Sequence, residues 1–149
     1  MTKQKIFEKI QEQIRQEIYP GASLALYQAG QWREFYFGLA DPQERKVTQA
    51  GLVYDLASVS KVVGVGTLAA FLYEQGKLDL DLPLQHYYPD FHREDVTVRQ
   101  LLTHTSGLDP FIPNRDQLTA PELKEALNHL TVLEDKTFRY TDVNFLLLG

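Results

Sequence analysis

Apolar residues recur at every fourth position near the start of the chain, at Ile6, Ile10, Ile14 and Ile18. Phe7 lies beside this stripe, and the positions between are mostly polar. Side chains spaced in this way fall on one face of a helix, so the pattern predicts an amphipathic helix over residues 3–18. The Tyr-Pro-Gly sequence at 19–21 then supplies residues that stop a helix.

A different period follows the predicted helix. Two short runs, 22–28 and 32–37, are rich in large apolar residues and flank the sequence Gln-Ala-Gly-Gln. This arrangement predicts two strands joined as a β-hairpin, with Phe35 and Phe37 on one face of the second strand. Residues 38–57 contain several turn-forming residues and are predicted to be mostly connection.

The remainder of the chain favours helices. Four of them are predicted, over 58–75, 97–104, 119–130 and 142–149. Thr97 and Thr119 each precede Gln or Glu by three positions, which is the pattern of a capping box. Gly76 is the expected C-terminal cap of the first of these helices, and Thr141 the expected N-terminal cap of the last. Residues 79–89 are predicted to be a loop with one short turn.

Composition and charge narrow the class of protein. The chain has 149 residues, 44% of them hydrophobic and 23% charged, which fits one soluble globular domain without an internal linker. A net charge of −5 argues against nucleic acid or an anionic membrane as the main partner. The absence of cysteine excludes disulfides, zinc–thiolate sites and a cysteine nucleophile.

The apolar runs and the charges near the N-terminus bear on location and membrane attachment. No apolar run reaches the length of a membrane span. Charged residues interrupt the first ten positions, where a signal peptide needs an apolar run. The sequence therefore predicts a cytoplasmic protein, or an exported one whose leader has been removed.

Candidate chemistry lies at the start of the helix predicted over 58–75, which opens with Ser-Val-Ser-Lys. Ser58 and Lys61 are three residues apart, so they share one helical face, and the amine can take the proton of the hydroxyl. The apolar residues that follow are expected to bury the lysine and lower its pKa. The helix N-terminus would also stabilise an oxyanion. In the alternative reading, Ser58 is a helix cap and Lys61 a solvated charge.

Four segments follow one another in a characteristic order: PGASLAL at 20–26, YDLASVSK at 54–61, EQGKLDLDLP at 74–83 and VTVRQLLTHTSGL at 96–108. Together they resemble the β-lactamase-like serine hydrolases, which include penicillin-binding proteins, D-alanyl-D-alanine carboxypeptidases, class C-type β-lactamases and esterases. The resemblance covers nearly the whole chain and implies an α/β (α+β) fold of the β-lactamase/transpeptidase type. In that fold an antiparallel sheet is flanked by helices. This chain would hold an incomplete, mostly helical part of it with an N-terminal hairpin.

The resemblance also implies roles for particular residues. Ser58 would be the nucleophile and Lys61 its activating partner. The family motif Tyr-x-Asn matches Tyr140, whose phenol would pass protons between nucleophile and leaving group; the alternative is a packed aromatic ring. Asp142 stands where the family usually has Asn, at a substrate-binding position. A carboxylate accepts but does not donate hydrogen bonds, which favours esterase or peptidase activity over an efficient β-lactamase.

A third family motif, Lys/His-Thr/Ser-Gly, does not occur after Tyr140, and the resemblance implies a position for it beyond Gly149. The apolar run at 145–148 and the short sheet also predict that 1–149 is the N-terminal portion of a serine hydrolase domain. We therefore expect weak or no activity from the chain alone. We also expect it to associate with another copy or with a missing C-terminal segment.

Other signals are weaker. Gly-x-Gly-x-x-Ala at 64–69 matches a dinucleotide-binding pattern but lies inside a predicted helix, where small residues more often allow close packing. His104 is conceivable as a triad base, although the resemblance implies a structural role. The other histidines are too scattered for a metal site.

The predicted function is acyl transfer through a Ser58 ester on an amide, ester or β-lactam carbonyl of a small-molecule or peptide substrate, with no metal or organic cofactor implied. The alternative is a penicillin-recognising binding or sensing module, or a catalytically silent homologue.

Overall fold

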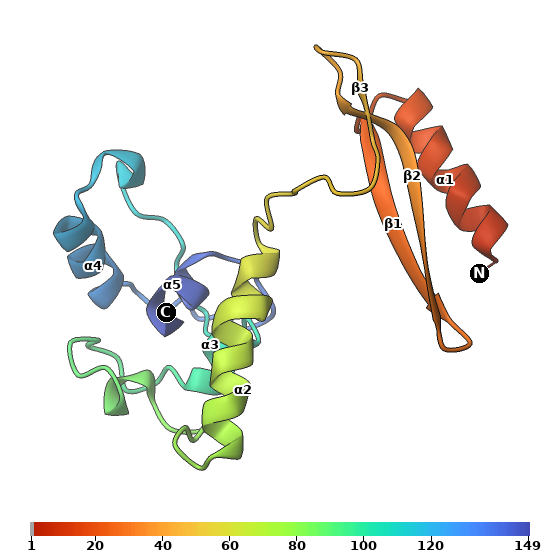
Figure 1. Ribbon diagram of the computed structural model, residues 1–149. Coiled ribbons are helices and arrows are strands. Elements are labelled where there is room, and N and C mark those ends of the chain that lie inside the picture. Colours follow the sequence, from red (N-terminus) through yellow and green to blue (C-terminus); the bar gives the residue numbers. More distant parts are fainter. Residues whose placement is uncertain (1) are drawn as a thin grey trace. The chain divides into compact units, whose positions relative to one another are not determined.

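The computed structural model describes residues 2–149, which form two compact units, the first ending at Asp55 and the second spanning Leu56–Gly149 (Figure 1). The first unit holds one helix and an antiparallel sheet of strand order β1-β2-β3. The second unit is helical apart from two isolated β-bridges. The predicted combination of an antiparallel sheet with helices is confirmed.

The first helix, α1 (Lys3–Arg15), is shorter than the predicted 3–18. Glu17 adopts a left-handed conformation with φ of 56°, and the N–H of Ile18 donates to the carbonyl of Gln13. These features form a Schellman closure, which ends a helix by satisfying its last carbonyls. Ile18 therefore lies outside the helix and is exposed.

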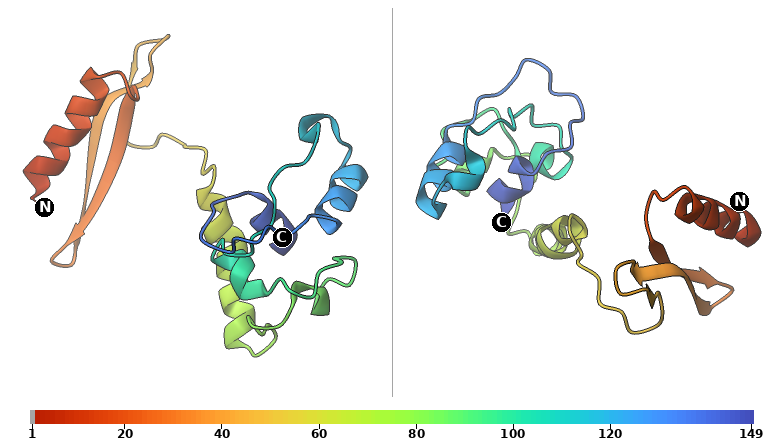
Figure 2. Two further views of the ribbon diagram at one scale, coloured as in Figure 1. Left: turned by 180° about the vertical axis from the view of Figure 1, so that it is seen from behind. Right: turned by 90° about the horizontal axis from the view of Figure 1, so that it is seen from above.

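The predicted hairpin is confirmed as β1 (Gly21–Gln28) and β2 (Gln31–Asp41), paired antiparallel. Its two-residue turn, at 29–30, has positive φ at both positions, as a type I′ turn requires. The ring centroid of Phe7 on α1 lies 4.6 Å from that of Phe35 and 5.2 Å from that of Phe37. The helix therefore covers one face of the hairpin, as both views of Figure 2 show.

The prediction that 38–57 is mostly connection was wrong at its start. Strand β2 continues to Asp41 and pairs with β3 (Lys46–Val47). Asp41 Oδ1 accepts from the N–H groups of Gln43 and Glu44, so the residues after it form a tight turn between two strands. Position 38 within β2 requires glycine for two reasons. Its φ is 66°, and a Cβ there would collide with the Pro20 carbonyl oxygen.

The second unit contains seven short helical elements. They are η1 (Lys61–Gly66), α2 (Thr67–Glu74), η2 (Leu84–His86), α3 (Val98–Leu102), η3 (Arg115–Gln117), α4 (Ala120–Asn128) and α5 (Val143–Leu148). The helix predicted over 58–75 corresponds to η1, which is π-helical, followed by α2. Gly76 ends it as predicted, with φ of 66°. Gly64 and Gly66 lie inside η1, so the strand that a dinucleotide site needs before its glycines is not there.

Capping follows the sequence in two places and departs from it in a third. Thr97 and Thr119 both form the predicted capping boxes. Thr141 was expected to cap the last helix, but the cap position belongs to Asp142. The Thr141 hydroxyl oxygen instead accepts from the Asn144 amide at 3.0 Å, as part of a buried network.

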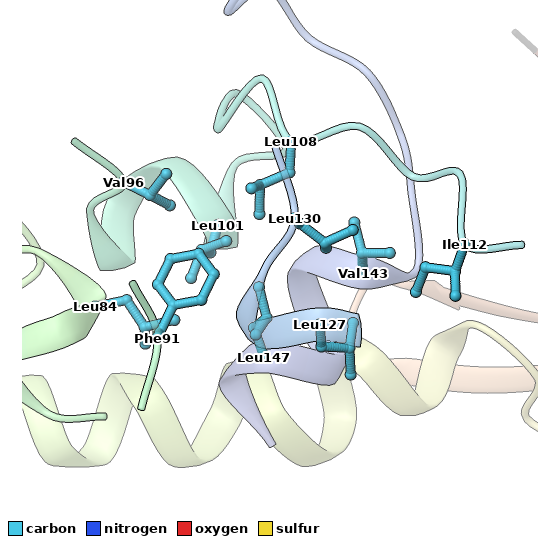
Figure 3. Packing of buried hydrophobic residues seen from close by; sticks show 10 residues of the cluster. All are labelled: Leu84, Phe91, Val96, Leu101, Leu108, Ile112, Leu127, Leu130, Val143 and Leu147. Atoms are coloured by element: carbon cyan, nitrogen blue, oxygen red, sulfur yellow. The ribbon is translucent and has the colours of Figure 1, made fainter. Parts of the chain in front are cut away.

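The hydrophobic core of the second unit gathers side chains from η2, α3, α4, α5 and the loops that join them (Figure 3). Phe91, Val96 and Leu101 are fully buried in it. Helix α5 packs against α3 and also contacts η1, where the candidate site lies. Within residues 2–149, none of the helices has the length and apolar character needed to cross a membrane.

Candidate active site

Ser58 lies in a turn at the N-terminal end of the helical segment that continues into η1. Ala57, immediately before it, has a φ of 44°, a left-handed conformation that is uncommon for alanine and often occurs at functional sites. Lys61, one turn later, donates from Nζ to Ser58 Oγ at 2.9 Å. The structure thus places the two side chains within hydrogen-bond reach, as their spacing predicts.

Tyr140 reaches the same hydroxyl from a distant part of the sequence. Its phenol interacts with Ser58 and then with Lys61, and these two contacts lower the pKa of Tyr140 below its usual value. Lys61 Nζ also lies 5.4 Å from the centre of the Tyr140 ring. The three residues predicted to carry catalysis are therefore brought together, and the phenol and the ammonium both face the candidate nucleophile.

Asp142 pairs with the lysine. Its Oδ1 lies 2.7 Å from Lys61 Nζ, and the side chain of Lys61 is only 16% exposed. The hydrogen bond to Asp142 is the main cause that raises the pKa of Lys61, while partial burial lowers that pKa to a smaller extent. The same contact lowers the pKa of Asp142. Our expectation that burial frees a neutral amine is wrong, because a carboxylate opposite an ammonium favours the charged form.

Arg115 is a member of the site that the sequence did not reveal. Its Nη2 lies 3.8 Å from Asp142 Oδ2, and its charge also lowers the pKa of Asp142. Arg115 lies on η3, a short 3-10 helix, and no sequence motif surrounds it. A pairing between side chains so far apart in sequence has no local signal.

Behind Tyr140 lies a buried polar cluster formed by His104, Ser106, Thr141 and Asn144, each at most 8% exposed. The sequence pointed to His104 and gave Thr141 only a capping role, and it assigned no role to Ser106 or Asn144. The ring of His104 packs on that of Tyr140, with centroids 4.6 Å apart. Its Nδ1 accepts hydrogen bonds from Thr141 and Asn144, so this nitrogen is not free to act as a base.

The contacts around Ser58 are suited to nucleophilic catalysis. A hydroxyl is contacted by a cation and by a phenol whose pKa is lowered, so a proton acceptor and a positive charge lie at one nucleophile. No group of three or more His, Cys, Asp or Glu side chains that could hold a metal ion occurs among residues 2–149.

Comparison with known proteins places this site in context. Residues 6–149 match the family described as Beta-lactamase. The chain belongs to this family. The predicted family resemblance is thereby confirmed, and with it the fold class.

Individual members of the family show the extent of the similarity. A β-lactamase of Providencia stuartii is 33% identical over 127 residues, which are 80% of this chain and 33% of that protein. The mitochondrial serine β-lactamase-like protein LACTB of Mus musculus is 42% identical over 78 residues, 48% of this chain and 14% of that protein. The crystal structure of a class C β-lactamase in complex with cefoxitin superposes with a TM-score of 0.82 at 28% identity, covering 99% of this chain and 42% of that one.

The chain thus spans about a third of the curated β-lactamase relative and less than half of the solved one. Membership of the Beta-lactamase family supports a serine hydrolase fold for the whole of 6–149.

Proposed function

We propose that this protein is a serine hydrolase that forms an acyl ester on Ser58 from an ester, amide or β-lactam carbonyl. The observation that carries the proposal is the 2.9 Å contact of Lys61 Nζ with Ser58 Oγ, at a hydroxyl that also interacts with the Tyr140 phenol. A hydroxyl becomes an effective nucleophile when an adjacent group can take its proton, and this pair of partners offers both such a group and a positive charge.

In the proposed reaction, Tyr140 acts as the base. Its lowered pKa increases the share of phenolate, whereas the raised pKa of Lys61 keeps that side chain an ammonium. Ser58 Oγ bonds to the carbonyl carbon as its proton passes to Tyr140. The phenol then gives this proton to the leaving oxygen or nitrogen as the scissile bond breaks. Water attacks the ester in a second cycle of the same proton transfers.

Lys61 has an electrostatic role in this scheme. An ammonium beside the phenolate and the attacking oxygen stabilises the negative charge that develops there. Asp142 favours the charged form of the lysine. Because this carboxylate cannot donate to a substrate, we propose esters or peptides as better substrates than β-lactams.

The second candidate is a penicillin-recognising sensor that acylates and then releases its acyl group slowly. The observation that favours it is the Lys61–Asp142 contact at 2.7 Å, which withholds the lysine amine as a base for deacylation.

Acylation and turnover separate these candidates. The chain is incubated with a fluorescent penicillin and, separately, with p-nitrophenyl acetate, and the acyl adduct is located by mass spectrometry. Adduct on Ser58 with continued release of p-nitrophenol supports the hydrolase, and adduct without release supports the sensor. Ser58→Ala should remove the adduct, while Ser60→Ala, two residues away, should retain it. A chain that forms no adduct with either reagent would contradict both.

Association is a further part of this proposal. In the first unit the rings of Tyr27 and Trp32, with centroids 5.1 Å apart, are 62% and 69% exposed. We propose that the chain associates with another copy, or with a polypeptide that supplies more of the family fold, because exposed apolar surface favours association. Light scattering of the purified chain over a range of concentrations tests the first of these.

A further inference from the structure

Four buried polar side chains form one connected network behind Tyr140. His104 follows α3, Ser106 lies in the loop after it, and Thr141 and Asn144 flank the start of α5. His104 and Thr141 are 8% exposed, and Ser106 and Asn144 are 2% exposed. Polar groups buried to this degree are costly unless they are paired, so the direction of each hydrogen bond carries information.

The backbone N–H of Thr141 fixes these directions. It can only donate, and it faces His104 Nδ1 at 3.4 Å, so Nδ1 carries no proton. The Asn144 group facing Nδ1, at 3.1 Å, must then be its amide nitrogen, which also donates to the Thr141 hydroxyl oxygen at 3.0 Å. The amide oxygen of Asn144 is left to accept from Ser106 Oγ at 2.6 Å. A consistent network therefore requires a His104 without a proton on Nδ1.

His104 also holds the backbone on both sides of Tyr140. Its carbonyl accepts from the N–H of Arg139 at 2.9 Å, and its Nδ1 accepts from the N–H of Thr141. Its ring packs on the Tyr140 ring between these two bonds. The backbone of His104 is left-handed, with φ of 57°. The Tyr140 side chain has much less support of its own, because the residue is 53% exposed.

We propose that His104 is a positioning residue, which holds the Tyr140 phenol against Ser58 and Lys61 through its bonds to residues 139 and 141 and through the Ser106–Asn144 network. The inference rests on the proposed function for its catalytic consequence, although the placement of the phenol can be measured without any substrate.

Charge around the ring is consistent with a neutral histidine. Burial is the main cause that lowers the pKa of His104, and the Lys61 ammonium lowers it further, while the Asp142 carboxylate opposes both. Tyr140 is the other titratable side chain in contact with the ring.

The test compares two substitutions that both suit a left-handed backbone. Asparagine tolerates positive φ and retains a hydrogen-bond acceptor near the position of Nδ1, and glycine tolerates positive φ but retains neither acceptor nor ring. His104→Asn and His104→Gly therefore differ in the side chain and not in backbone strain. Thr105→Ala, next to His104, is the matched control, since Thr105 Oγ1 contacts Thr103 Oγ1 rather than the network.

The first measurement is the titration of Tyr140 in the 149-residue chain labelled with ¹³C at the tyrosine ζ carbon, assigned with Tyr140→Phe. We expect the wild-type chain, His104→Asn and Thr105→Ala to show the lowered pKa of Tyr140. In His104→Gly we expect this pKa to return toward its usual value, because the phenol leaves Ser58 and Lys61. A Tyr140 pKa that is unchanged in folded His104→Gly would overturn the proposal.

The second measurement is the rate of Ser58 acylation by p-nitrophenyl acetate as a function of pH. His104→Gly should slow acylation by about 10- to 100-fold, the range expected when a catalytic group is misplaced by about 1 Å. His104→Asn keeps the acceptor and loses only the ring, so it should lose less than about tenfold, the size of one aromatic ring contact. Equal losses in both variants would overturn the positioning role.

The two measurements keep the inference separate from the proposed function. If Ser58 is not acylated in the wild-type chain, the proposed function fails while the Tyr140 titration still decides whether His104 positions the phenol. If His104→Gly does not fold, as judged by its thermal unfolding transition, Ser106→Ala replaces it. That variant removes the donor that orients Asn144 and should shift the Tyr140 pKa in the same direction by a smaller amount. No shift in a folded Ser106→Ala chain would then contradict the proposal.

Discussion

The two sides of Tyr140 are built on different physical principles. On one side, Lys61 and Asp142 form an ion pair with the carboxylate side chain 49% exposed. On the other side, His104 and Asn144 are buried and joined by hydrogen bonds between groups that we assign as neutral. The ion pair controls which groups are charged, and the neutral network controls where the phenol lies. The comparison shows that one residue can depend on two neighbourhoods for two separate properties.

Tyr140→Phe should have the largest effect and should separate the catalytic role of the phenol from the packing of its ring. The substitution removes the hydroxyl that contacts Ser58 while keeping a ring to pack on His104. We expect acylation of Ser58 to fall by about 10²- to 10⁴-fold, the usual contribution of general acid–base catalysis. The midpoint of thermal unfolding should stay close to that of the wild type. Acylation within a fewfold of the wild-type rate would show that the phenol is not the base.

Asn144→Ala should act on the other side. It removes the acceptor of the Ser106 hydroxyl proton, the donor to the Thr141 hydroxyl oxygen and one of the two donors to His104 Nδ1. A buried polar group left unsatisfied costs about 1–3 kcal/mol. We expect the free energy of unfolding, measured with urea, to drop by that amount. Gln117→Ala, at an exposed position on η3, should change it by no more than about 0.5 kcal/mol. Equal effects of the two substitutions would mean that the network adds nothing to stability.

Asp142→Asn should change charge without disturbing placement. The carboxylate raises the pKa of Lys61 and, to a smaller extent, that of Tyr140. Its removal should lower both values, so that basic forms become available at lower pH. The acid limb of the acylation rate against pH should move to lower pH, with a several-fold gain near neutrality. A shift to higher pH would contradict the assignment of these groups.

The smallest expected effect is the pH dependence of stability from His104. Its pKa in the folded chain is below the usual 6.5, so the unfolded chain binds a proton at higher pH than the folded one. This contribution to stability is complete above about pH 6.5 and is lost as pH falls through the lowered pKa. Urea unfolding at pH 7.5 and pH 5 should show a larger decrease for the wild type than for His104→Asn. An equal decrease in both would place the acid sensitivity elsewhere.

Much of the local structure could be predicted from sequence alone. The capping boxes at Thr97 and Thr119, the end of α2 at Gly76 and the Ala-Gly turn of the hairpin all formed as expected. Each depends on backbone conformation and hydrogen bonds within a few residues, which the residue types specify directly. The contact between Ser58 and Lys61 is also local, because the two residues are one helical turn apart.

Other properties depend on segments that are distant in sequence. Pairing of β3 with β2 requires strands on either side of a turn to meet. The charge state of Lys61 is decided by Asp142, which the packing of α5 brings to η1, and the orientation of Tyr140 by His104, at the end of α3. Sequence pattern predicts burial but not which charge or acceptor lies opposite a buried group. A pKa depends on those partners as much as on burial, so only the tertiary structure decided the chemistry of this site.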